Sequence, residues 1–167
     1  MYTWKRTPDH NPLVIKGCRQ CGKTYSVLKF ARAHYKHVIY INFFENPRYA
    51  DIFTGTLNVD AICGYMTAML GPDATFESGK TCIVLDELQE CPNARTALKF
   101  FKLDGRYDVV CTGSLLGIQG YSDKAASVPV GYETVIDMCP MDFEEFLWAT
   151  GTPDNIIAEI AQCKETH

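Results

Sequence analysis

Short apolar runs alternate along this chain with segments of helical periodicity. Five runs have the character of β-strands, since they are rich in β-branched and aromatic residues and are bounded by turn residues. They cover residues 12–16, 37–42, 81–87, 107–114 and 133–138. The run "TCIVLDE" is too apolar to alternate, which is typical of a strand that is covered on both faces. The pattern therefore predicts five buried strands.

Helical periodicity fills the intervals between these runs. Apolar residues recur every three or four positions in segments 23–35 and 59–70, and in a segment that starts near Pro92 and faces inward as far as Phe101. Strands that alternate with helices favour a parallel sheet with helices on both faces. We predict an α/β fold of three layers with a parallel sheet of about five strands.

The last part of the chain has a different pattern. The stretch 115–131 has no clear periodicity and is predicted to be a surface loop, while two helical patterns, 142–149 and 153–163, follow Pro140. We divide the chain into a core, residues 1–139, and a C-terminal helical segment, residues 140–167, which we expect to begin a lid or a downstream domain.

The first of these C-terminal helices carries a start signal. Asp142 and Glu145 have the spacing of a capping box. The apolar side chains that follow are spaced to form one helical face, which we expect to be buried: Phe143, Phe146 and Leu147.

Composition narrows the classes of protein. The chain has 167 residues, 47% of them hydrophobic, which suits one domain with a sizeable core. Its net charge is −4 and its Lys and Arg residues are scattered, so nucleic-acid binding is not indicated. The first residues lack the apolar segment of a secretory signal, and the apolar runs are too short to span a membrane. We expect a cytoplasmic protein without membrane contact.

Eight cysteines are present. Cys82, Cys111 and Cys139 fall in or beside apolar runs, where we expect them to be small buried side chains rather than disulfide partners. This use of cysteine agrees with a reducing compartment.

The segment "GCRQCGKT" directly follows the first strand and opens the first long helix. It fits the pattern G-x-x-x-x-G-K-[ST], whose backbone N–H groups surround a phosphate at the positive end of a helix. Lys23 would reach the β- and γ-phosphates, and Thr24 would ligate magnesium. We predict that ATP or ADP binds here through Gly17, Cys18, Arg19, Gln20, Cys21, Gly22, Lys23, Thr24 and Tyr25.

The same segment contains C-x-x-C, Cys18 to Cys21, which could be half of a zinc site or a redox pair. A structural zinc site needs four Cys or His ligands, and the chain has no second C-x-x-C and no H-x-x-x-H. The zinc interpretation is therefore weak. Oxidation of the pair, which would block the nucleotide site, stays open.

Polar residues lie at the ends of the third and fourth predicted strands, residues 81–87 and 107–114. "CIVLDELQ" closes with Asp86, which would hold the water shell of magnesium, and Glu87, which would polarise the attacking water as general base. The alternative is an exposed acidic strand end. In "CTGS", Thr112 and Ser114 could contact the γ-phosphate, because ligands of open α/β sheets bind at this edge. The alternative is ordinary turn residues. Glu87 and Lys23 are the predicted catalytic side chains.

Five segments together resemble the AAA-like ATPase family of bacteria and archaea in order and spacing, over about residues 4–150: "NPLVIKGCRQCGKT", "VIYINF", "CIVLDELQECP", "VVCTGSLLG" and "MCPMDFEEFL". The resemblance implies an additional-strand P-loop NTPase fold, with the Walker A motif at 17–24, Walker B at 82–87 and sensor 1 near 112–114. Members are predicted cytoplasmic ATPases that usually continue into a C-terminal nuclease-like domain of unknown function.

The chain departs from this family in two places. Many relatives carry an Arg just after the Gly that precedes the last strand, where this sequence has Tyr132. The sequence also ends at His167, before a lid or the usual downstream domain, so we expect a truncated chain or a natural fragment with a missing domain or partner.

Three classes of function remain. The first is hydrolysis of ATP with magnesium to drive a conformational change in an attached domain or partner. The second is a nucleotide-gated scaffold with little turnover, and the third a P-loop phosphotransferase. Adjacent Asp86 and Glu87 favour hydrolysis, and the absence of N-K-x-D disfavours a GTPase. We expect slow turnover and leave a homo-oligomer open, in which Arg95 or Arg106 could serve a neighbour, although both are expected to be solvated surface charges.

Overall fold

The computed structural model describes residues 1–72, 74–114 and 131–163. The predicted loop 115–131 lies outside these residues except for Gly131. The sheet has the order β2-β3-β4-β1-β5, and every neighbouring pair is parallel. Its strands are β1 Leu13–Gly17, β2 His37–Asn42, β3 Thr81–Asp86, β4 Asp108–Ser114 and β5 Thr134–Met138. The predicted parallel sheet of five strands is confirmed.

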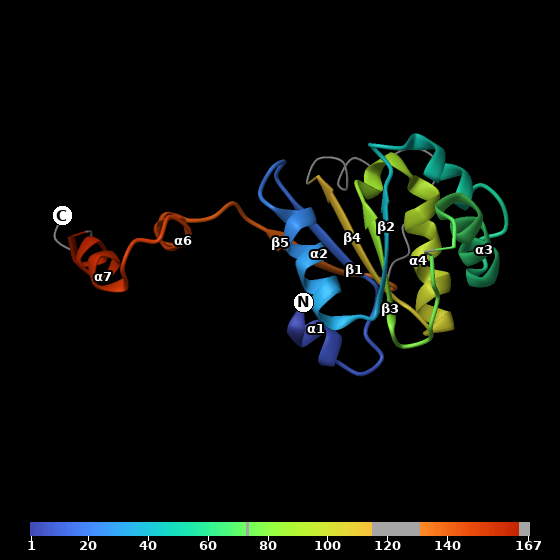
Figure 1. Ribbon diagram of the computed structural model, residues 1–167, viewed down its shortest axis with the longest axis horizontal. Coiled ribbons are helices and arrows are strands. Elements are labelled where there is room, and N and C mark those ends of the chain that lie inside the picture. The colour runs from blue at the N-terminus through green and yellow to red at the C-terminus, as the bar shows by residue number, and fades with distance from the viewer. Residues whose placement is uncertain (73, 115–130, 164–167) are drawn as a thin grey trace.

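The helices cover the sheet on both sides (Figure 1). The described helices are α1 Tyr2–Arg6, α2 Lys23–His34, α3 Val59–Leu70, α4 Pro92–Asp104, α6 Phe143–Ala149 and α7 Asp154–Cys163, with the 3-10 helices η1 Pro47–Phe53 and η2 Leu88–Glu90. Helices α1 and α2 pack on one face, and α3, α4 and η1 pack on the other. The three predicted layers are thus present. None of the described helices is long and apolar enough to cross a lipid bilayer.

Alternate side chains of the central strands supply the two halves of the core. Leu13 and Ile15 belong to the cluster under α1 and α2, whereas Val14 between them belongs to the cluster under α3 and α4. Every residue of β3 is buried. Burial on both faces explains why these strands read as continuous apolar runs.

The chain leaves the sheet after β5, which is an edge strand. Figure 1 shows an extended segment that runs from β5 to α6 and α7, which lie away from the sheet. Asp142 caps α6 in the predicted capping box with Glu145. The prediction that this helix is buried is wrong, because Phe143 and Phe146 are half exposed and Leu147 is only partly buried. Periodicity identifies an apolar helix face but does not show which surface covers it.

Two expectations about individual side chains are also wrong. Cys139 is exposed, unlike the buried Cys82 and Cys111, because it follows the last residue of an edge strand. Arg95 is not a solvated charge: its guanidinium donates to both carboxylate oxygens of Glu133, at 2.6 and 3.1 Å, and both side chains are 9% exposed. Arg106 is partly exposed and pairs with carboxylates on the surface.

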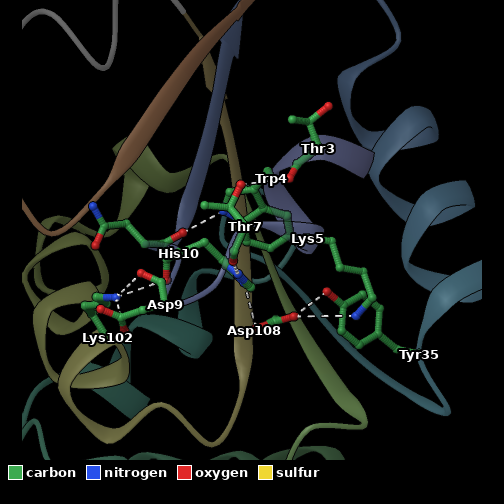
Figure 2. Close-up of polar contacts among 10 residues, drawn as sticks. Thr3, Trp4, Lys5, Thr7, Asp9, His10, Tyr35, Lys102 and Asp108 are labelled. Carbon is green, nitrogen blue, oxygen red and sulfur yellow. Dashed lines mark hydrogen bonds and ion pairs between the residues drawn. The ribbon is translucent and has the colours of Figure 1, made fainter.

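A polar network ties the N-terminal segment, including Lys5 on α1, to Asp108, the first residue of β4 (Figure 2). Asp108 accepts from the Tyr35 hydroxyl at 2.5 Å, and it lies 3.0 Å from His10 Nε2 and 3.7 Å from Lys5 Nζ. Burial, together with this carboxylate, raises the pKa of the Tyr35 phenol well above its usual range. The network therefore anchors the N-terminal segment without touching the carboxyl edge of the sheet.

A close backbone approach makes Gly17 sensitive to substitution. A Cβ atom at this position would lie 2.3 Å from the Met138 carbonyl oxygen on β5. We expect Gly17→Ala to lower the free energy of unfolding by about 1–3 kcal/mol, because backbone atoms must shift to relieve the overlap. Urea unfolding measures this loss.

Gly64→Ala is the matched control. A Cβ atom on Gly64, which lies within α3, meets nothing within 4 Å, and Ala is the better helix former by up to about 1 kcal/mol. A Gly17→Ala protein as stable as the parent would contradict the close approach of β1 and β5.

Candidate functional site

The loop between β1 and α2 lies where the strands end. Gln20 and Gly22 adopt left-handed backbone conformations, with φ of 63° and 88°. Left-handed residues within a turn let successive N–H groups point toward one concave side, which is the geometry of an anion-binding nest. Gly22 is also the N-cap of α2, so the positive end of this helix faces the same place. The predicted phosphate loop has the backbone form that its chemistry requires.

Lys23 is folded back onto this loop. Its ammonium group donates to the carbonyl oxygens of Gly17, at 3.2 Å, and of Cys18, at 2.6 Å, and the side chain is nearly buried. Neutral carbonyls compensate a buried cation less well than an anion does. A phosphate group bound in the loop would therefore be a stronger partner for Lys23.

The carboxylate of Asp86 collects hydrogen bonds from three surrounding elements. Asp86 is only 2% exposed at the end of β3. The Thr24 hydroxyl on α2 lies 3.0 and 3.1 Å from its two oxygens. Tyr40 and Asn42 on β2 donate to it at 2.8 and 3.3 Å, and the buried Thr112 hydroxyl on β4 donates as well. The carboxylate is thus held in one orientation.

Tyr40 and Asn42 were not among the predicted site residues. Both lie in a predicted strand, but their contact with Asp86 depends on the register in which Asn42 pairs with Asp86 across β2 and β3. Burial, with a contribution from the Asp86 carboxylate, raises the pKa of Tyr40 to about 12. Tyr40 therefore keeps its proton and stays a hydrogen-bond donor at neutral pH.

Oxygen ligands suitable for a hard cation meet at this point. Mg²⁺ is bound by oxygen atoms such as those of the Thr24 hydroxyl and the Asp86 carboxylate, together with phosphate oxygens and water. The oxygen atoms of these two side chains are therefore suitable ligands for magnesium.

The described residues contain no comparable site for zinc. Within the ranges that the structure describes, no group of three or more His, Cys, Asp or Glu side chains is arranged to hold a metal ion.

Glu87 lies one residue beyond Asp86, in a left-handed backbone conformation with φ 56° and ψ 50°. The side-chain amide of Gln89 donates to a Glu87 carboxylate oxygen at 2.5 Å. The same amide accepts a hydrogen bond from the Ser114 backbone N–H at 3.3 Å. The predicted base and the predicted end of β4 are therefore connected through Gln89, a residue to which sequence analysis assigned no role.

A cavity of about 400 Å³ opens between the loop and η2, a size usual for small-molecule sites. Its lining residues are Arg19, Gln20, Gly22, Lys23, Thr24, Tyr25, Phe44, Glu87, Gln89 and Glu90. Most of the predicted loop residues and the predicted base thus share one cavity. Asp86 and Thr112 are buried and do not line the cavity. Thr112 bonds to Asp86, and Asp86 bonds to Thr24, which does line it. Phe44, which sequence analysis did not identify, exposes an aromatic ring there.

A protein of known structure shares this fold. The ORC2 protein of Aeropyrum pernix, solved in ADPNP-ADP complexes, superposes with a TM-score of 0.55 at 16% identity over 86% of this chain and 45% of that one. PCH-2 of C. elegans has a TM-score of 0.47 and 15% identity over 90% of this chain and 40% of that one. The chain spans less than half the length of either protein. No curated protein matches the sequence significantly.

The family comparison covers most of the chain. The model of a family described as "AAA domain" matches residues 9–147, a segment that contains the whole sheet, the loop and the Asp86-Glu87 pair. The sheet order, the loop conformation and this match agree with one another. The chain therefore belongs to the AAA domain family of P-loop ATPases.

Proposed function

We propose that this protein binds ATP with magnesium in the cavity beside the loop and hydrolyses it. One observation carries the proposal: the Thr24 hydroxyl, at the start of the loop helix, bonds to the buried Asp86 carboxylate directly before Glu87. A phosphate loop, a pair of metal ligands and a water-activating carboxylate thereby meet at one end of the sheet. The family and the fold are those of nucleotide-binding ATPases, which supports the proposal.

The loop would bind the nucleotide through its phosphates. The backbone N–H groups from Gly17 to Thr24 and the N-terminus of α2 favour an anion there. Lys23 would exchange its two carbonyl partners for oxygens of the β- and γ-phosphates, while Arg19, Gln20 and Tyr25 would line the bound nucleotide. The structure of the ORC2 neighbour with ADPNP-ADP complexes is consistent with a nucleotide as ligand.

Thr24 and Asp86 are the residues that would hold Mg²⁺. When bound, the ion neutralises charge on the phosphate oxygens. Tyr40, Asn42 and Thr112 keep the Asp86 carboxylate directed toward Thr24, so the metal ligands need little rearrangement.

Glu87 would act on the attacking water. The water oxygen forms a bond to the γ-phosphorus, the bond from that phosphorus to the β–γ bridging oxygen breaks, and a water proton passes to the Glu87 carboxylate. ADP and inorganic phosphate are the products. Ser114, at the end of β4, would lie beside the γ-phosphate, and Thr112 would act through Asp86.

Turnover by this chain would be slow. An arginine that contacts the transferred phosphoryl group contributes about 10³–10⁵ in rate. Arg19 is the one arginine among the described residues that line the cavity, and it belongs to the loop itself. Because no arginine from outside the loop is among the described lining residues, a second candidate function is also favoured, a nucleotide-gated scaffold with little turnover.

Hydrolysis would drive a conformational change in an attached domain or a partner protein. Segment 140–167 follows β5 directly, and its described helices stand away from the sheet, as expected for the start of a lid or a downstream domain (Figure 1). A homo-oligomer would supply a second arginine from outside the loop, beside Arg19, which is the one arginine among the described lining residues.

Lys23→Ala should weaken binding of ATP with magnesium by at least about tenfold, since it removes the ammonium group placed at the phosphates. Titration calorimetry measures the dissociation constant. Lys36→Ala is the control, because Lys36 is exposed and pairs with Glu77 at the other end of the sheet. Equal affinities of the Lys23→Ala and parent proteins would contradict the binding site.

Replacement of both Cys18 and Cys21 by Ser should leave nucleotide affinity unchanged, because the loop contributes backbone groups at these positions. No zinc should accompany the purified parent protein in elemental analysis. Stoichiometric zinc in the parent that is lost in the double variant would instead establish a metal site.

Glu87→Gln should lower the rate of phosphate release by at least about 100-fold, because the amide cannot accept the water proton. ATP binding should persist, and the parent itself should turn over more slowly than the roughly 10 s⁻¹ typical of enzymes. Glu90→Gln is the matched control, since Glu90 lines the same cavity but follows no strand end. A Glu87→Gln protein as active as its parent would show that another group is the base.

A further inference from the structure

We propose that Gln89 is a positioning residue for the proposed ATP hydrolysis, which holds the Glu87 carboxylate in the cavity and ties its orientation to the end of β4. The inference rests on the proposed function. Gln89 and Glu87 both line the cavity, and they lie two residues apart at the start of η2.

The partners of Gln89 determine how its amide is oriented. The Ser114 backbone N–H can only donate, so it requires the amide oxygen, which it meets at 3.3 Å. The ionised Glu87 carboxylate can only accept, so it requires the amide nitrogen, which it meets at 2.5 Å. Each end of the amide thus faces the one type of group that it can bond, and a flipped amide would lose both contacts.

The hydrogen bond from Gln89 restricts the rotation of the Glu87 side chain. A glutamate side chain has several rotatable bonds, and fixing them before the reaction lowers the barrier by placing the base near the water. Gln89 occupies one Glu87 oxygen, Oε2, which leaves Oε1 for the water. The left-handed backbone of Glu87 directs the side chain from a turn rather than from a regular strand. Gln89 therefore supplies the orientation that the turn alone does not fix.

The second contact of Gln89 connects the base to the phosphate loop. Ser114 pairs in register with Gly17, the first residue of that loop, across β4 and β1. A shift of the loop when phosphates enter or leave would pass through Ser114 to Gln89 and so to Glu87. Gln89 is thus placed to make the orientation of the base respond to the nucleotide.

The turn that carries Gln89 has its own anchors. Leu88 is 1% exposed in the core, and backbone bonds run from Glu90 N–H to the Glu87 carbonyl and from Cys91 N–H to the Leu88 carbonyl. The fold of η2 does not depend on the Gln89 amide, so variants at this position should remain folded.

Gln89→Glu is the sharpest test, because it keeps the size of the side chain and an acceptor for Ser114 but places a second carboxylate against Glu87. We expect kcat for ATP with magnesium to fall by at least about tenfold, since the base loses its orientation. The added charge lies in the cavity that Gln89 lines, so KM and the dissociation constant of ATP should rise, but by a smaller factor than kcat falls. A role confined to folding would instead lower the melting temperature and the folded fraction and leave kcat per folded molecule unchanged, which would overturn the proposal.

Gln89→Leu in a Glu87→Gln background provides the second measurement. If Gln89 acts through Glu87, the double variant should be no slower than Glu87→Gln alone. A further loss in the double variant would overturn the proposal.

The parent and Glu87→Gln proteins, assayed in parallel, separate the two claims. If the parent shows no turnover that depends on Glu87, the proposed function fails and the role of Gln89 fails with it. If that turnover is present but Gln89→Glu is as active as the parent, the role of Gln89 alone is wrong.

Discussion

The buried carboxylate of Asp86 is the constraint on which this site depends. An ionised group that is 2% exposed is costly unless hydrogen bonds replace its water. Here the donors come from α2, β2 and β4, so the need to satisfy one charge brings Thr24, Tyr40, Asn42 and Thr112 to a common point. The same contacts that stabilise the carboxylate also hold the proposed magnesium ligands in place. Stability and the proposed function therefore depend on the same interaction.

The order of the strands explains how the remaining parts meet. β4 lies between β1, which leads into the phosphate loop, and β3, which ends at Asp86. Groups on β4 can therefore contact both neighbours: Thr112 reaches Asp86, and Ser114 reaches Gln89 while it pairs with Gly17. A parallel sheet places all these strand ends at one edge, which is where ligands of open α/β folds bind.

Sequence patterns predicted the five strands, the main helices and the loop at 17–24, because each is encoded by neighbouring residues. What they missed depends on distant pairing. The contacts of Tyr40 and Asn42 with Asp86 follow from strand register, which the sequence does not state. The half-exposed Phe143 shows that periodicity defines an apolar helix face but does not show which surface packs against it. The burial of Arg95 could not be predicted either, because its carboxylate partner lies 38 positions away in the sequence.

The most direct test of the account is a crystal structure of this protein with Mg²⁺ and a non-hydrolysable ATP analogue. We expect the Lys23 ammonium to leave the carbonyl oxygens of Gly17 and Cys18 and to contact phosphate oxygens, while Thr24 and the Asp86 carboxylate face the metal ion. An analogue bound elsewhere, with Lys23 still on the two carbonyl oxygens, would contradict it.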